Sequence, residues 1–111
     1  MPNVNETNLA EPTLEQIKAD AEAGDATAQF ILGGMYENGD EVQEDIEQAL
    51  VWYHKAAAQG LADAQFNLGV ITETGQGVPQ DYLKARDWYE KAATQGDAAA
   101  QFNLGLLYAD G

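Results

Sequence analysis

Cysteine and serine are both absent from the 111 residues of the sequence. A chain without cysteine forms no disulfides, thiolate metal sites or cysteine nucleophiles, and one without serine has no serine triad. Apolar runs of about 18 residues, which a transmembrane helix would need, are absent too. The amino terminus has neither the basic nor the apolar stretch of a signal peptide, so we predict a cytoplasmic protein.

Basic residues are scarce, because the chain has 5 lysines and arginines against 19 acids and a net charge of −14. Binding of phosphate groups requires clustered lysine and arginine, so nucleic acid is not expected as a partner. Anionic membranes are not expected as partners for the same reason. The acidity favours solubility and leaves a basic protein as the partner that charge alone would attract.

What the sequence does contain is a repeat of 36 residues. Gly24–Gln59 and Gly60–Gln95 are two full copies, identical at half of their positions, and residues 96–111 begin a third copy. Repetition with a period of about 20 to 50 residues is typical of solenoids, in which each copy buries its apolar face against the next. We therefore predict a stack of structurally equivalent copies.

Apolar spacing and glycine positions divide each full copy into two helices. A preceding segment at 13–23, with Thr13 and Gln16 at capping-box spacing, resembles a degenerate second helix and is predicted to cap the stack. The result is one domain at 13–111 after a flexible polar lead at 1–12, with an all-α, α/α superhelical solenoid fold of about six helices. The predicted helices of the two full copies span 26–38, 45–59, 62–74 and 81–95.

Three departures between the copies bear on local structure. Leu61 replaces the aspartate that precedes the first helix in the other copies, so we expect this helix to lose its N-terminal cap. Glu41 stands where the second copy has Gly77, and we expect the first loop to follow a different backbone path. Thr72 replaces a tyrosine that is present in the other two copies.

Small and aromatic residues recur inside the helices at the repeat period. Gly33 and Gly69 each cost a helix about 1 kcal/mol relative to alanine, so we predict that two helix backbones approach closely there. The Trp-Tyr pairs at 52–53 and 88–89 recur at fixed positions. We interpret them as core residues rather than as a platform for stacking on a sugar.

The motif A-x-A-Q-x-x-L-G, followed by V-x-x-D-x-x-x-A-x-x-W-Y-x-K-A-A-x-Q-G, is present in both full copies. With it, residues 24–111 resemble the Sel-1-like repeat family, a relative of the tetratricopeptide repeats. The resemblance implies an α/α superhelix that serves as an adaptor or scaffold in protein complexes.

By analogy with the tetratricopeptide repeats, a concave groove would be lined by the first helix of each copy. These helices contain no lysine or arginine, so we expect the groove to bind an apolar or basic segment of a protein partner. For the phenylalanines at 30, 66 and 102, packing between neighbouring repeats is an equal alternative. The residues predicted to contact the partner are Phe30, Glu37, Asn38, Asp63, Phe66, Val70, Glu73 and Thr74.

Acidic residues also cluster in the loop of the first copy. A calcium loop is not predicted, because Gly34 and not an aspartate lies five residues before Gly39. The cluster is interpreted as a solvated loop, with a contact for a basic partner and a weak cation site as alternatives. Its members beyond Glu37 are Asp40, Glu41, Glu44, Asp45 and Glu47.

The third copy includes its first helix but no second helix to cover it. An uncovered solenoid end leaves apolar side chains in water, and here these would be Phe102, Leu106 and Leu107. We predict that this edge either pairs with a second copy of the chain in a homodimer or is covered by further residues of a longer protein.

Together these patterns predict a non-catalytic protein-interaction module without metal or cofactor. An acidic inhibitor of the immunity type, which blocks a basic toxin or nuclease, is the alternative hypothesis. A hydrolase-like enzyme is the third hypothesis, although the one histidine, His54, takes a variable position that holds Glu90 in the next copy. Acid–base catalysis by paired carboxylates would need a dry pocket, to which no pattern in the sequence points.

Overall fold

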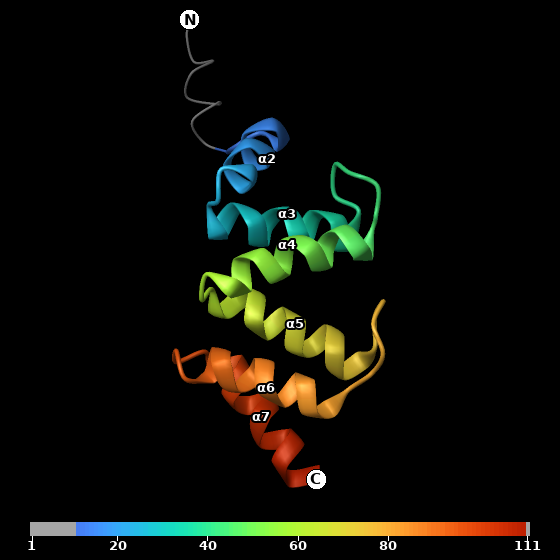
Figure 1. The fold of residues 1–111 in the computed structure, drawn as a ribbon, viewed down its shortest axis with the longest axis vertical. Coiled ribbons are helices and arrows are strands. Elements are labelled where there is room, and N and C mark those ends of the chain that lie inside the picture. Colours follow the sequence, from blue (N-terminus) through green and yellow to red (C-terminus); the bar gives the residue numbers. More distant parts are fainter. Residues whose placement is uncertain (1–10, 111) are drawn as a thin grey trace, which may run out of the picture.

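Six helices make up the regular structure of residues 11–110, the part of the chain that the computed structural model describes. They stack in chain order into a rod of 61 × 28 × 21 Å, with α2 and α7 at opposite ends (Figure 1). The main contacts join helices that follow one another in the sequence. The all-α solenoid is thus confirmed. Its helices are α2 (Leu14–Glu22), α3 (Ala26–Asn38), α4 (Ile46–Ala58), α5 (Ala62–Thr74), α6 (Tyr82–Ala93) and α7 (Ala98–Asp110).

Hydrogen bonds of the cap side chains confirm the predicted capping box of α2 and the predicted start of α3. Thr13 and Gln16 form the complete capping box of α2, with N–O distances of 3.2 and 3.1 Å. Asp25 accepts from the backbone N–H of Ala28 at the start of α3. Leu61 gives α5 no side-chain cap and packs instead against the core between repeats. The middle copy therefore has an apolar contact in place of a capping bond.

Glycine and aspartate set the remaining helix boundaries. α3 and α5 end at Gly39 and Gly75, whose φ angles of 73° and 78° are left-handed, a region that glycine enters without steric cost. α4 and α6 begin one residue later than predicted, because Asp45 and Asp81 act as N-caps rather than as first helical residues.

The loop between α3 and α4 does not follow the prediction. We expected Glu41 to give this loop a different path from the loop at Gly77, yet both residues are left-handed, with φ angles of 62° and 74°. The prediction was wrong because the helices at either side fix the path. In both loops the capping aspartate donates its backbone N–H to a carbonyl near the end of the preceding helix, at 2.8 and 3.0 Å. Glu41 therefore carries backbone strain that glycine would not.

Replacing Glu41 by glycine should raise the free energy of unfolding by about 1 kcal/mol, because glycine enters the left-handed region freely. The opposite exchange, Gly77→Ala, should destabilise the protein, since its Cβ would lie 2.9 Å from Cγ2 of Ile46. Urea unfolding followed by circular dichroism measures both changes. Glu41→Ala is the control, because alanine keeps the Cβ that makes the left-handed conformation unfavourable. If Glu41→Gly is no more stable than Glu41→Ala, residue 41 is not strained.

Two tyrosines and a set of alanines form the core. Tyr53 and Tyr89 are 1% and 0% exposed, and the ring of each lies on a glycine of the facing helix. A Cβ on Gly33 would lie 2.7 Å from the ring of Tyr53, and one on Gly69 would lie 2.5 Å from the ring of Tyr89. The predicted close approach at these glycines is confirmed, but the main neighbour is a tyrosine ring rather than a second backbone.

Buried glutamines join each repeat to its neighbours. Gln65 of α5 donates to the carbonyl of Ala57 in α4 at 3.3 Å and accepts from the side chain of Gln95, in the turn after α6, at 2.9 Å. Gln29 makes the equivalent pair of bonds one repeat earlier, to a carbonyl of α2 and from Gln59, the residue that follows α4. Because both ends of each buried amide are satisfied, these bonds specify the register in which the copies stack.

α2 is the first described helix and packs against α3 at one end of the stack (Figure 1). Its residues Ile17 and Ala21 are buried in one cluster with Leu32 and Met35 of α3. Most of its other side chains are exposed and polar, which is the arrangement expected of a capping helix. The flexible lead that the sequence predicts at 1–12 lies almost wholly outside the described residues.

Membrane crossing requires a long apolar helix, and the six described helices include none that is long and apolar enough.

Candidate functional site

An acidic hollow lies between the two long interhelical loops, which project on the same side of the stack (Figure 1). Its volume is about 360 Å³. The end of α3 and the α3–α4 loop contribute the acids, and the α5–α6 loop contributes uncharged atoms from the next repeat. We call this hollow the acidic cleft. It is lined by Glu37, Asn38, Glu44, Ile46, Gln76 and Gly77.

A tyrosine hydroxyl positions the first carboxylate of the acidic cleft. Tyr53 of α4 donates to Oε1 of Glu37 at 2.6 Å, and Tyr89 of α6 donates to Oε1 of Glu73 at 2.7 Å one repeat later. Each bond ties the second helix of a copy to the first helix of the same copy. A carboxylate that has accepted one bond still has acceptor sites for a cationic group, so Glu37 can be anchored to the core and contact a ligand.

Burial is the main reason why the pKa of Tyr53 and that of Tyr89 lie far above the ordinary tyrosine value of 10.0, and the bonds to Glu37 and Glu73 raise both further. An asparagine of the next copy opposes the shift at each tyrosine. At Tyr89 this is Asn103, whose Nδ2 lies 3.4 Å from the hydroxyl. Both hydroxyls therefore keep their protons in the folded protein.

Alkaline pH should destabilise the fold through these two tyrosines. Their pKa is raised in the folded state, so above about pH 10 the unfolded state loses protons first and the free energy of unfolding falls as pH rises. The double variant Tyr53→Phe/Tyr89→Phe lacks both protons and should show a flatter decline. Urea midpoints measured between pH 8 and 11 test this, and parallel declines in the two proteins would refute it.

The other acids of the predicted cluster do not converge on one site. Asp45 accepts from two backbone N–H groups at the start of α4, so its carboxylate serves as a helix cap. Asp40, Glu41 and Glu47 are exposed and do not line the acidic cleft, whereas Glu44 does. Within residues 11–110, no group of three or more His, Cys, Asp or Glu side chains is placed to hold a metal ion.

The phenylalanine row lies against the core tyrosines. The ring centroids of Phe30 and Tyr53 are 5.8 Å apart, as are those of Phe66 and Tyr89. Phe30 and Phe66 are partly buried in clusters that include residues of the next repeat, whereas Phe102 is 67% exposed. The first two phenylalanines therefore contribute to packing between repeats, whereas Phe102 is largely exposed on α7.

The remaining predicted groove residues do not line the acidic cleft. Asp63 is exposed, and Val70 packs partly buried against the cluster around Tyr89. Thr74 donates its hydroxyl to the carbonyl of Val70 at 2.8 Å. Of the eight residues predicted to contact a partner, the structure brings only Glu37 and Asn38 together in this hollow.

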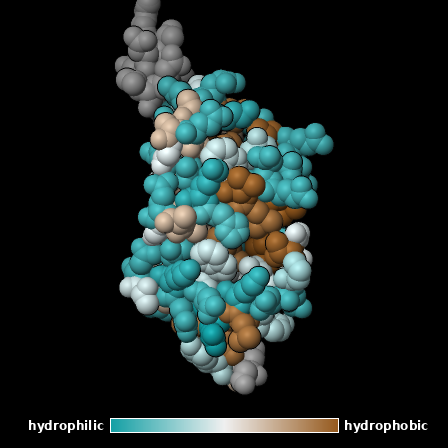
Figure 2. Space-filling view, viewed as in Figure 1, coloured by the Kyte–Doolittle hydropathy of each residue, from teal (hydrophilic) through white to brown (hydrophobic). Residues whose placement is uncertain are grey.

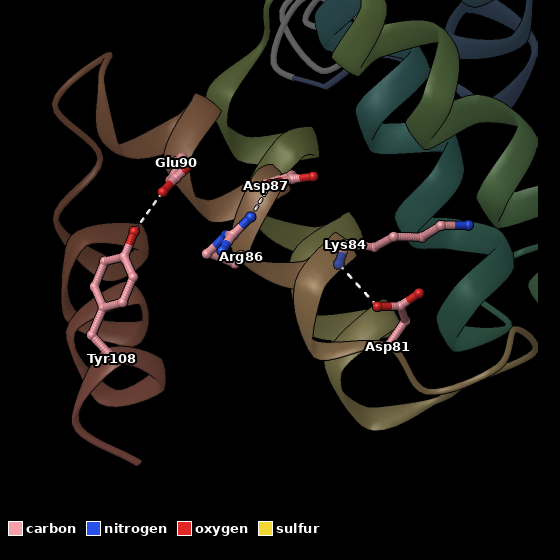
Figure 3. Close-up of polar contacts among 6 residues, drawn as sticks. All are labelled: Asp81, Lys84, Arg86, Asp87, Glu90 and Tyr108. Atoms are coloured by element: carbon pink, nitrogen blue, oxygen red, sulfur yellow. Dashed lines mark hydrogen bonds and ion pairs between the residues drawn. The ribbon is translucent and has the colours of Figure 1, made fainter. Parts of the chain in front are cut away.

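α7 presents an open face at the carboxyl-terminal end of the stack. Leu106 is 50% exposed, while Leu107 packs partly buried against the last core cluster. A Cβ on Gly105 would meet nothing within 4 Å, in contrast to the equivalent Gly69. Tyr108, which the prediction left out of this edge, is 58% exposed and donates to Oε2 of Glu90 at 2.6 Å (Figure 3).

His54 is an exposed residue of α4 whose ring edge contacts Trp88, with centroids 5.6 Å apart. Partial burial lowers the pKa of the imidazole below its ordinary value of 6.5. No carboxylate bonds to it among the described residues, so it lacks the orienting partner of a catalytic base.

Comparison with protein families identifies one repeat type along the chain. The family model described as Sel1 repeat matches residues 26–61, 62–97 and 98–111. These matches cover most of the chain and have the same 36-residue period as the copies seen in the sequence.

Three known proteins illustrate the similarity. Over 48 residues the chain is 47% identical to the secretory immunoglobulin A-binding protein EsiB of Escherichia coli O6:H1, a match covering 43% of this chain and 10% of that protein. The crystal structure of c5321, a protective antigen of uropathogenic Escherichia coli with an SLR fold, aligns with a TM-score of 0.88 at 46% identity, covering 90% of this chain and 21% of that one. A Sel1 repeat protein from Oxalobacter formigenes aligns with a TM-score of 0.82 at 39% identity, covering 87% and 73%. The chain thus spans only about a tenth to a fifth of the first two proteins.

Proposed function

Because the chain belongs to the Sel1 repeat family, we propose that it is a protein-interaction scaffold whose acidic cleft binds a basic or apolar segment of a partner. Sel1 repeat proteins generally mediate protein–protein interaction and are typically non-catalytic scaffolds. EsiB is named for binding an immunoglobulin, so the ligand of that relative is itself a protein. The proposal rests on one observation, that Glu37, Asn38 and Glu44 line the same hollow.

Charge favours a lysine or arginine of the partner as the group that enters the acidic cleft. The cation would meet two carboxylates and no basic side chain of α3 or α5, since neither helix contains lysine or arginine. Two bases of the second helices, Lys55 and Lys91, lie over the rings of Trp52 and Trp88, at 5.8 and 4.7 Å. Hydrogen bonds between a cation and a carboxylate contribute roughly 1.5–3 kcal/mol, more than neutral ones.

A pair of matched peptides tests the cleft. We expect a fluorescein-labelled 12-residue peptide of lysine and leucine to bind, with an affinity that falls as salt rises, and its counterpart with glutamate for lysine not to bind. Glu44→Lys should weaken binding about tenfold, because it places a cation in the cleft. Glu22→Lys on α2 makes the same change in net charge far from the cleft and should have a much smaller effect. If both variants lose the same amount of peptide affinity, the net charge of the protein and not the cleft is responsible for binding.

Two sequence-based expectations remain proposals about the setting of this scaffold. We propose that it acts in the cytoplasm, which fractionation of native cells tests. We also propose that the open face of α7, with Phe102 and Leu106 exposed, pairs with a second copy when no other helix covers it. Sedimentation at increasing concentration tests this pairing, and a strict monomer would exclude it.

A further inference from the structure

A second pocket, of about 220 Å³, lies where the middle copy has a threonine and the other two copies have a tyrosine. α4, α5, α6 and the α5–α6 loop surround it. Thr72 lies in its wall with the hydroxyl bonded to the carbonyl of Leu68 at 2.7 Å, so this side chain leaves the space open. Figure 2 shows hydrophobic surface in this region, over α4 and the α5–α6 loop. The lining also includes Leu50, His54, Val78 and Trp88, together with the charged side chains of Asp81 and Lys84.

The first copy shows what belongs in this space. There Tyr36 packs, partly buried, against the cluster that contains Leu32. Four apolar lining residues of the pocket have an identical residue one period earlier, and all four of those earlier residues belong to the same packed group as Tyr36. The equivalent pairs are Leu50 with Leu14, Leu68 with Leu32, Val78 with Val42, and Trp88 with Trp52.

The third copy shows where the hydroxyl of such a ring would point. Tyr108, the equivalent of Thr72, donates to Glu90 at 2.6 Å (Figure 3). One period earlier, the position of Glu90 is held by His54, which lines the pocket. A phenol ring placed like that of Tyr108 would therefore direct its hydroxyl at the imidazole, whose unprotonated nitrogen is a hydrogen-bond acceptor.

We propose that this pocket binds the side chain of a tyrosine carried by a partner protein. The ring replaces the one that the middle copy lacks, and its hydroxyl donates to His54. The volume is below the roughly 300–1,000 Å³ of sites for drug-sized ligands, which fits a single ring. That the ring arrives on a protein rests on the proposed scaffold function, whereas the preference for a phenol does not.

Titration with p-cresol, which is the tyrosine side chain as a free molecule, tests the ring site. In ¹H–¹⁵N spectra we expect saturable shifts at the backbone amides of Thr72 and Val78 and at the indole of Trp88. Thr72→Tyr fills the space from within and should abolish these shifts. Shifts that persist in Thr72→Tyr, or that arise only around the exposed Phe102, would overturn the proposal.

The first copy provides a second variant in case Thr72→Tyr does not fold. Tyr36→Thr empties the equivalent space and should add a second set of p-cresol shifts, at Val42 and the indole of Trp52. If Tyr36→Thr binds no additional p-cresol while the protein stays folded, the equivalence between the two sites is refuted.

Two further ligands separate the parts of the proposal. Toluene, which lacks the hydroxyl, should bind to the wild type several-fold more weakly than p-cresol does. In His54→Ala, which lacks the acceptor, toluene and p-cresol should bind with equal affinity. N-acetyl-tyrosinamide should bind at least as well as p-cresol, because its backbone extends away from the pocket. If p-cresol binds and N-acetyl-tyrosinamide does not, the pocket accepts free phenols but not the tyrosine of a partner, and the proposal fails. Failure of the lysine peptide at the acidic cleft would leave the p-cresol result unchanged and would challenge only the scaffold function.

Discussion

Tyr89→Ala is expected to lower the free energy of unfolding by about 3–5 kcal/mol, the range for deleting a buried aromatic ring. Three losses combine in this change. The fully buried ring leaves a cavity between α5 and α6, the contact with Phe66 at 5.8 Å disappears, and Glu73 loses its 2.7 Å bond. Because domains of this size are stable by only about 5–15 kcal/mol, the loss would remove a large share of the total.

Tyr108→Ala is the matched control for this prediction. Tyr108 also donates to a glutamate, but it is 58% exposed and lies on the last helix. We expect its removal to cost less than about 1 kcal/mol. Urea midpoints from circular dichroism compare the two proteins, and similar losses would show that Tyr89 does not hold the core together as its burial implies. Tyr89→Phe separates the ring from the hydroxyl and should cost only about 1 kcal/mol.

Gly69→Ala is expected to be the second most damaging change, with a net loss of about 2 kcal/mol. Alanine normally stabilises a helix interior by about 1 kcal/mol relative to glycine. Here the new Cβ would lie 2.5 Å from Cε1 of the Tyr89 ring, which the surrounding core holds in place. Overpacking costs about 1–3 kcal/mol. Because the ring cannot move away, we expect a cost at the upper end of this range, which outweighs the helical gain.

The third copy again provides the control. Gly105 occupies the equivalent position, and a Cβ there would meet nothing within 4 Å. Gly105→Ala should therefore stabilise the protein by up to about 1 kcal/mol, so one substitution has opposite signs in two equivalent positions. Combining Gly69→Ala with Tyr89→Ala should cost less than the sum of the two, because the ring that causes the clash is gone. If the losses of the two single variants simply add, the clash with the Tyr89 ring is not what makes Gly69→Ala destabilising.

Much of the fold could be predicted because each copy of the repeat gives the same signals for where its helices begin and end. The bounds of α3 and α5 match the prediction, since Gly39 and Gly75 end both helices at equivalent positions. The loop at Glu41 was predicted wrongly, because residue type was given more weight than the helices that fix the loop. Helix geometry therefore outweighs the local preference of a single residue in this stack.

The candidate site was less accessible to prediction, for a physical reason. A repeat pattern aligns equivalent positions, but the acidic cleft joins positions that are not equivalent, such as Glu44 and Gln76. Tyr53 and Glu37 both recur one period later, so their recurrence was visible, yet periodicity does not reveal which recurring residues touch. The departure at Thr72 was likewise visible in the sequence. Whether neighbouring side chains would close the resulting space depended on packing in three dimensions.

The helices of this stack contact mainly the helices next to them in the sequence, which affects how such proteins can change in length over evolution. When each copy touches only the copies beside it, duplication of one 36-residue unit adds one new junction and leaves the existing junctions intact. The buried glutamines support the new junction, because the Gln of each added copy can donate to a backbone carbonyl of the helix before it. Gene duplication can therefore lengthen the rod without redesign of the core.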